Sequence, residues 1–190
     1  MKIGLYFGSF NPIHIGHLII ASHILNFTEL KKVWFIVSPQ NPLKSSNTLL
    51  NEYHRLHLVR LAVEDNTALA ASDVEFKLPR PSFTIDTLTY LKEKYPEHEF
   101  AVIMGSDSFQ NIQKWKNPDQ LIENNNIIIY NRPGFTVQKQ HPNLVILQDT
   151  PMLEISATTI RSLAKKGKSI RYLVPDKAAE EIEVCGYYRK

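Results

Sequence analysis

Residues 8–17 read GSFNPIHIGH, between an apolar run that predicts a strand, Ile3–Phe7, and a stretch that predicts a helix, Ile15–Phe27. Ligands of open α/β sheets bind where a strand ends and the next helix begins. A helix start offers unpaired backbone N–H groups and a partial positive charge, which suit a phosphate. His14 and His17 are three positions apart, so both imidazoles are expected on one face of the first turn. We therefore predict that this corner binds phosphate.

Outward from this corner, apolar runs of strand length alternate with stretches of helical period. Further strands are predicted at Val33–Val37, Leu69–Phe76, Phe100–Met104, Ile127–Tyr130 and Leu144–Leu147. Further helices are predicted at Glu52–Glu64, Thr84–Tyr95 and Ser156–Lys166, with a last one from Pro175 to near Gly186; Pro39–Asn51 and Lys77–Phe83 read as loops. Such alternation predicts a doubly wound, Rossmann-like α/β fold, with a parallel sheet covered by helices on both faces. No repeat or linker divides the sequence, so we expect a single domain over 1–190 with a small helical C-terminal part at about 155–190.

Composition narrows the class of protein. With 43% hydrophobic and 22% charged residues, the 190-residue chain has the usage of an ordinary globular protein. A net charge of +3 favours anionic ligands but is too small to indicate nucleic acid. The single cysteine, Cys185, excludes an intramolecular disulfide and a cysteine metal cluster. The first apolar stretch is interrupted by Gly4 and stops at Gly8, too short for a signal peptide. No apolar run has the length of a membrane helix, so we expect a cytoplasmic protein without a membrane or nucleic-acid partner.

A second helix start carries similar chemistry. Residues 155–161 read ISATTIR, with Ser156 placed to cap the helix and Thr159 at its third position. Arg161 adds a guanidinium, which can make bidentate contacts to phosphate. The sequence therefore predicts a second anion site at this helix start.

Both strings resemble signatures of the HxGH nucleotidyltransferase superfamily. Residues 8–17 are similar to GxFDPxHxGH, with Asn11 where Asp is usual, and residues 155–161 are similar to ISSTxIR, with Ala157 in place of Ser. The chain lacks the GxGxxG and GxxxxGK[ST] motifs, which disfavours a simple dehydrogenase and a kinase. It also lacks the KMSKS-like loop of the class I aminoacyl-tRNA synthetases, which share HxGH.

Other strings resemble one branch, the bacterial nicotinate-nucleotide adenylyltransferases. They are RPSFTIDT at 80–87, GSD at 105–107, KW at 114–115, RPGF at 132–135 and YLVPD at 172–176. The likeness runs in one order from residue 3 to about residue 188. One departure is Leu43, within Asn41-Pro42-Leu43-Lys44, where the family often has His.

The resemblance implies an enzyme that transfers the adenylyl group of ATP to nicotinate mononucleotide in NAD biosynthesis, giving nicotinate adenine dinucleotide and pyrophosphate. The implied catalytic residues are His14, His17, Lys44 and Arg161. The ATP site would comprise Gly8, Ser9, Phe10, Gly16, His17, Gly105, Asp107, Ile155, Ser156, Thr159 and Arg161. The mononucleotide site would comprise Asn11, Lys44, Ser82, Phe83, Thr84, Trp115 and Arg132.

Residue chemistry supports these assignments. Free amides at the helix start Ser82-Phe83-Thr84 could hold a carboxylate, Trp115 could stack on a pyridine ring, and Asp107 could accept hydrogen bonds from ribose. No carboxylate cage for a metal is visible in the sequence, so we expect Mg²⁺ to arrive with the ATP phosphates.

Two alternatives remain open at this point. The chain could be another adenylyltransferase, acting on nicotinamide mononucleotide or pantetheine phosphate, or a non-catalytic nucleotide-binding module. The sequence also leaves a monomer and a homo-oligomer both open.

Overall fold

The first strand forms the middle of a parallel sheet. The computed structural model describes residues 1–40, 49–151 and 153–189, and these form a six-stranded sheet in the order β3-β2-β1-β4-β5-β6. Strand β1 pairs in parallel with β2 on one side and with β4 on the other. The strand order reverses between β1 and β4, and a doubly wound sheet binds its ligands at such a reversal.

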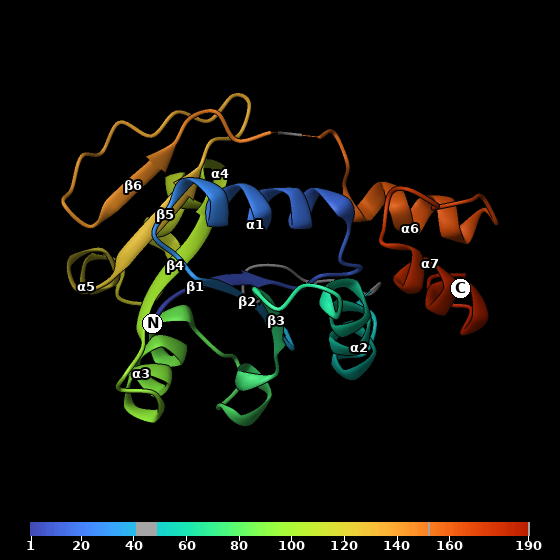
Figure 1. The fold of residues 1–190 in the computed structure, drawn as a ribbon, viewed down its shortest axis with the longest axis horizontal. Coiled ribbons are helices and arrows are strands. Elements are labelled where there is room, and N and C mark those ends of the chain that lie inside the picture. Colours follow the sequence, from blue (N-terminus) through green and yellow to red (C-terminus); the bar gives the residue numbers. More distant parts are fainter. Residues whose placement is uncertain (41–48, 152, 190) are drawn as a thin grey trace.

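The elements alternate along the chain as predicted (Figure 1). The strands are β1 (Lys2–Gly8), β2 (Lys32–Val37), β3 (Leu69–Ser72), β4 (Glu99–Gly105), β5 (Asn126–Tyr130) and β6 (Leu144–Leu147). The helices are α1 (Ile15–Phe27), α2 (Glu52–Val63), α3 (Thr84–Lys94), α4 (Ser106–Gln110), α5 (Pro118–Asn124), α6 (Ala157–Lys165) and α7 (Asp176–Val184). Two short 3₁₀ helices, η1 (Val74–Lys77) and η2 (Ile112–Lys114), join them.

The sheet buries both of its faces. Neighbouring residues of one strand belong to different hydrophobic clusters: Ile127 and Ile129 to one, Ile128 and Tyr130 to the other. The cluster of Ile128 and Tyr130 includes buried residues of α1, α2, α6 and α7, and the cluster of Ile127 and Ile129 includes buried residues of α3, α4 and α5. Figure 1 shows α1 and α3 on opposite sides of the sheet. The prediction of a Rossmann-like sheet covered on both faces is confirmed.

The predicted strand Leu69–Phe76 is too long. Strand β3 ends at Ser72, whose hydroxyl accepts a hydrogen bond from Val74 N at 3.3 Å. This local bond turns the chain into η1, a case of a serine side chain competing with the sheet for a backbone N–H. The turn buries the Glu75 side chain, and the predicted strand gives no indication of this burial.

Residues 106–124 contain helices that were not predicted. Helix α4 starts directly after β4, so Asp107 lies in a first helical turn rather than at a strand end. Helix α5 begins with Pro118, in the first turn, where proline is favoured.

The C-terminal helices follow the prediction closely. Ser156 caps α6, Gly167 lies beyond its end with a φ of +65°, and Pro175 is the N-cap of α7. Within the described part of the chain, no helix combines the length and apolar character needed to cross a membrane.

Candidate functional site

A cleft of about 460 Å³ opens at the carboxyl end of the sheet. Its walls come from the ends of β1, β4 and β5 and from the starts of α3 and α6. Most of the predicted site residues line it: Gly8, Ser9, Phe10, Asn11, His17, Ser82, Phe83, Thr84, Gly105, Asp107, Trp115, Arg132 and Arg161. The structure thus brings both signature strings and the mononucleotide residues to one cavity.

His17 is the histidine of the first signature that lines the cleft. Its ring stacks on that of His14, with centroids 3.7 Å apart, and Phe10 and Tyr6 meet it edge-on. His14 is the N-cap residue of α1 and is itself buried. One imidazole therefore faces the cleft, and the other supports it from behind.

The backbone determines which nitrogen of His17 carries its proton. The amide N–H of His14 donates to Nδ1 of His17 at 3.2 Å, so that nitrogen is an acceptor and Nε2 must be the donor in the neutral ring. Burial lowers the pKa of His14 to about 4, and the Arg132 guanidinium acts in the same direction. Burial, His14 and Arg132 likewise lower the pKa of His17 well below its ordinary value. Near neutral pH, His17 is thus a neutral hydrogen-bond donor.

The glycines of the first signature make room for side chains of the chain itself. A Cβ on Gly16 would lie 3.1 Å from Nδ1 of His14, and one on Gly8 would lie 2.8 Å from the Phe10 ring. The resemblance implies that both glycines belong to the ATP site. At Gly16 the structure places the His14 ring in the space that a Cβ would need.

The second signature meets the first through Arg161. Its Nη1 donates to the carbonyl of Asn11 at 2.8 Å, across 150 positions of sequence, and its Nη2 donates to Oγ1 of Thr158 at 3.2 Å. Ser156 caps α6 by accepting from Thr159 N at 3.1 Å. The helix start therefore places Arg161 at the edge of residues 8–17, the predicted phosphate corner.

The predicted mononucleotide residues form one wall of the cleft. Ser82-Phe83-Thr84 leads into α3, and Trp115 follows η2. Lys116 joins the two segments, because its Nζ donates to both carboxylate oxygens of Asp86, at 2.8 and 2.9 Å, and lies 5.1 Å from the Phe83 ring. An aromatic plane and a helix start with free amides consequently face the same space.

Asp107 and Arg132 lie against each other rather than in separate subsites. Nε of Arg132 is 3.5 Å from Oδ1 of Asp107, and the guanidinium lies 5.7 Å from the Tyr130 ring. Arg132 also lowers the pKa of both histidines, which places its charge near the phosphate corner. Arg132, expected with the mononucleotide, is thus close to groups expected to bind ATP.

Sequence reasoning missed Glu75, which lines the same cleft. Its carboxyl is buried, its Oε1 accepts from Oγ1 of Thr87 at 3.0 Å, and its Oε2 has no hydrogen-bond partner among the described residues. Burial raises the pKa of Glu75, while the hydroxyls of Ser38, Ser82 and Thr87 act against that shift. No sequence signal marked this residue, because its position depends on the turn into η1.

The remaining predicted residues lie elsewhere. The cleft wall does not include His14, Gly16, Ile155, Ser156 or Thr159, although each adjoins a residue or helix start that contributes to it. Lys44 and Leu43 lie outside the described residues.

The cleft offers more cations and hydroxyls than carboxylates. No group of three or more His, Cys, Asp or Glu side chains that could hold a metal occurs within residues 1–40, 49–151 and 153–189. Asp107 lies in the cleft, but it is paired with Arg132. Such walls suit a polyanion that brings its own counter-ion.

Comparison with known proteins adds independent findings. A family model described as cytidylyltransferase-like matches residues 5–163. A Flavobacterium johnsoniae protein named "Probable nicotinate-nucleotide adenylyltransferase" is 49% identical over 194 residues, which cover 100% of both chains. A Cytophaga hutchinsonii protein of the same name is 48% identical, over 99% of this chain and 98% of its own.

A solved structure has the same fold. The Plasmodium falciparum nicotinic acid mononucleotide adenylyltransferase complexed with NaAD superposes with a TM-score of 0.82 at 21% identity, over 99% of this chain and 97% of that one.

Proposed function

The chain belongs to the nicotinate-nucleotide adenylyltransferases of the cytidylyltransferase-like family, and from that premise we propose that it transfers the adenylyl group of ATP to nicotinate mononucleotide. The observation that carries the proposal is the shared cleft. His17 and Arg161, from the two signatures, line one cavity with the wall made by Ser82 and Trp115. One ligand can thus meet the phosphate corner while the other meets the aromatic wall.

The transfer is a single displacement. A 5′-phosphate oxygen of the mononucleotide attacks the α-phosphorus of ATP in line, and a new P–O bond forms. The bond from the α-phosphorus to the oxygen that bridges to the β-phosphate breaks, and its electron pair leaves with pyrophosphate. A phosphate monoester is already ionised near neutral pH, so no general base is required.

The protein contributes position and charge. Nε2 of His17 donates to a phosphate oxygen as a neutral group, and Arg161 supplies positive charge in the same cleft. Arg132 adds a second guanidinium near the histidines. Lys44 remains a candidate for neutralising phosphate charge. His14 holds the His17 ring in place.

Mg²⁺ enters with the ATP phosphates as part of the substrate. The residues of the cleft fit this arrangement. Their polar side chains are mostly cations and hydroxyls, so the anionic oxygens that bind the metal come from the triphosphate. We place the reaction in the cytoplasm, where ATP is available.

A substrate panel tests the proposal. Purified protein with Mg²⁺ and ATP is supplied in turn with nicotinate mononucleotide, nicotinamide mononucleotide and pantetheine phosphate, and pyrophosphate release is followed alongside product chromatography. We expect the highest kcat/KM with nicotinate mononucleotide. A preference for either of the other acceptors would replace the proposed substrate, and ATP binding without transfer to any acceptor would favour a non-catalytic module.

A further inference from the structure

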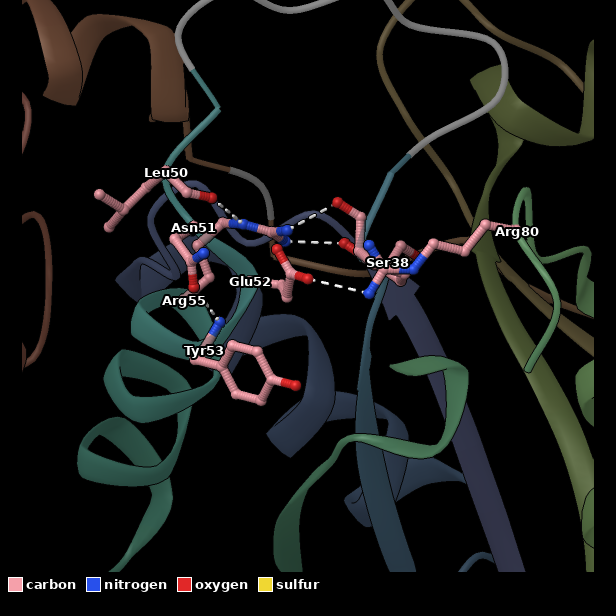
Figure 2. Close-up of polar contacts among 8 residues, drawn as sticks. Ser38, Leu50, Asn51, Glu52, Tyr53, Arg55 and Arg80 are labelled. Atoms are coloured by element: carbon pink, nitrogen blue, oxygen red, sulfur yellow. Dashed lines mark hydrogen bonds and ion pairs between the residues drawn. The ribbon is translucent and has the colours of Figure 1, made fainter. Parts of the chain in front are cut away.

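Arg55, in the first turn of α2, is a buried cation in an unusual setting. Its side chain is fully buried, and no ion pair joins it to a carboxylate of the described residues. The guanidinium instead donates to four backbone carbonyls: Nε to Leu50 at 2.7 Å, Nη1 to Ser9 at 2.5 Å and Ser38 at 2.8 Å, and Nη2 to Pro39 at 2.9 Å. A buried charge is tolerated only when its hydrogen bonds are made, and here backbone oxygens alone make them. Figure 2 shows the guanidinium between Leu50 on one side and the end of β2 at Ser38 on the other.

The four carbonyls belong to three separate segments of chain. Ser9 follows β1, Ser38 and Pro39 follow β2, and Leu50 precedes α2. Ser9 and Ser38 both line the cleft, yet their carbonyl oxygens are taken up by a guanidinium buried beneath it. A carbonyl oxygen repels a phosphate, whereas a backbone N–H attracts one. Turning these oxygens toward Arg55 therefore removes negative partial charge from the place where a triphosphate would lie.

The same contacts reach both signature strings. Leu50, whose carbonyl Arg55 holds, donates its N–H to Oδ1 of Asn11 at 3.2 Å. Arg161 donates to the carbonyl of Asn11 at 2.8 Å. Arg55 thus holds the loop after β1 directly at Ser9 and, through Leu50, at the residue that Arg161 contacts.

The first turn of α2 also reaches the mononucleotide wall. Glu52 accepts from Nη2 of Arg80 at 2.9 Å, shortly before Ser82 in the chain, and this ion pair lies beside Arg55 in Figure 2. Both substrate walls are therefore tied to one helical turn.

We propose that Arg55 is a positioning residue for adenylyl transfer, which fixes the phosphate-binding loop by gathering the carbonyls at the ends of β1 and β2 beneath the cleft. The inference rests on the proposed function. Arg55 touches neither substrate, and it acts through Ser9 and Asn11. Lysine cannot replace it, because an ammonium is a single point with three donors, while the four carbonyls are spaced around a planar fork.

The test is the Arg55→Lys variant of the full chain, which keeps the charge and loses the fork. We expect kcat/KM for ATP to fall at least tenfold, while KM for nicotinate mononucleotide changes by less than threefold. Hydrogen exchange of the amides at residues 9–11 should quicken in the same variant, because their loop has lost its anchor.

Two controls separate positioning from stability. Arg60→Lys makes the same substitution at an exposed site of α2, and Val63→Ala removes buried volume at the far end of that helix. Each rate is divided by the folded fraction at the assay temperature, which thermal unfolding provides. Both controls should then keep the wild-type kcat/KM for ATP.

The outcomes decide the matter. If Arg55→Lys and a second variant, Arg55→Gln, lose activity only in proportion to their folded fraction, or if neither folds at any temperature, then Arg55 is a structural residue and the proposal is overturned. A rise of threefold or more in KM for nicotinate mononucleotide would also overturn it. Failure of the wild-type protein to form a dinucleotide would instead refute the proposed function.

Discussion

At the scale of single residues, the proposed mechanism relies on His17, whose lowered pKa keeps the ring neutral near neutral pH. Its Nδ1 is occupied by the N–H of His14, so the donor at Nε2 exists before any substrate arrives. A donor held in place in advance needs no reorganisation during the reaction, which is why such groups stabilise transition states strongly.

Replacement of His17 by alanine should therefore lower kcat by about a hundredfold or more, equivalent to about 3 kcal/mol of transition-state stabilisation. The fold should persist, because the His17 side chain lines the open cleft. Steady-state kinetics, with circular dichroism as a check of the fold, measures both. The matched variant is His17→Gln, whose amide nitrogen can take the place of Nε2 and should recover part of the rate. Normal turnover in His17→Ala would contradict the role of this side chain.

Glu75 should make stability depend on pH in a direction opposite to that of an ordinary ion-paired acid. Its pKa is raised in the folded protein, so its contribution to stability is fully present below the ordinary value of 4.5 and is lost as pH rises through the raised pKa. Glu75→Gln has no proton to lose. We expect its free energy of unfolding to exceed that of the wild type by a margin that grows between pH 5 and pH 8.5.

Urea unfolding of the two proteins at each pH measures that margin, and the other titrating groups cancel in the difference. Parallel curves for the two proteins would show that Glu75 does not titrate in this range.

At the scale of elements, the start of α6 delivers one guanidinium to the phosphate corner. Replacing Arg161 by alanine removes that charge and the bond to Asn11. We expect KM for ATP to rise about tenfold or more, since a charge-assisted hydrogen bond contributes about 1.5–3 kcal/mol, while KM for the mononucleotide changes less. Steady-state kinetics with each substrate varied in turn checks this, with Arg171→Ala, beyond α6, as the control. A larger effect on the mononucleotide would reassign the side chain.

Elements with strong local signals could be predicted, and the others could not. The polar cap at Ser156 identified α6, and the apolar runs identified the strands of the sheet. The sequence pattern predicts a strand through most of η1. That prediction is wrong because a local bond from Val74 N to the Ser72 hydroxyl ends β3 early.

The same distinction holds for the residues of the candidate site. Residues inside continuous motifs, such as His17 and Ser82, could be placed at the cleft from sequence. Arg55 and Glu75 could not, because their positions follow from carbonyls and hydroxyls that only the folded chain brings together.

At the scale of the whole molecule, one hydrophobic cluster joins the sheet to the C-terminal helices. Ile160, Ala178 and Ile182 are buried in the same cluster as Tyr6 and Phe35. The prediction that 1–190 is a single domain implies that these parts unfold together.

Replacing Ile182 by alanine should thus lower the free energy of unfolding by about 2–5 kcal/mol, because it leaves a cavity in that shared cluster. The two tryptophans pack in the other cluster, so fluorescence reports that cluster, whereas far-ultraviolet circular dichroism reports the helices and strands of the whole chain. Their denaturation midpoints should coincide in the wild type and shift equally in Ile182→Ala. A separate early transition in the variant would indicate two units.

The hydrogen bond between Arg161 and Asn11 has a consequence during synthesis of the chain on the ribosome. The ribosome completes the HIGH string early, and 150 further positions must follow Asn11 before its guanidinium partner exists. The proposed ATP site therefore cannot be complete in the amino-terminal half of the chain alone. A chain released before Arg161 would carry residues 8–17 without the guanidinium that contacts the Asn11 carbonyl.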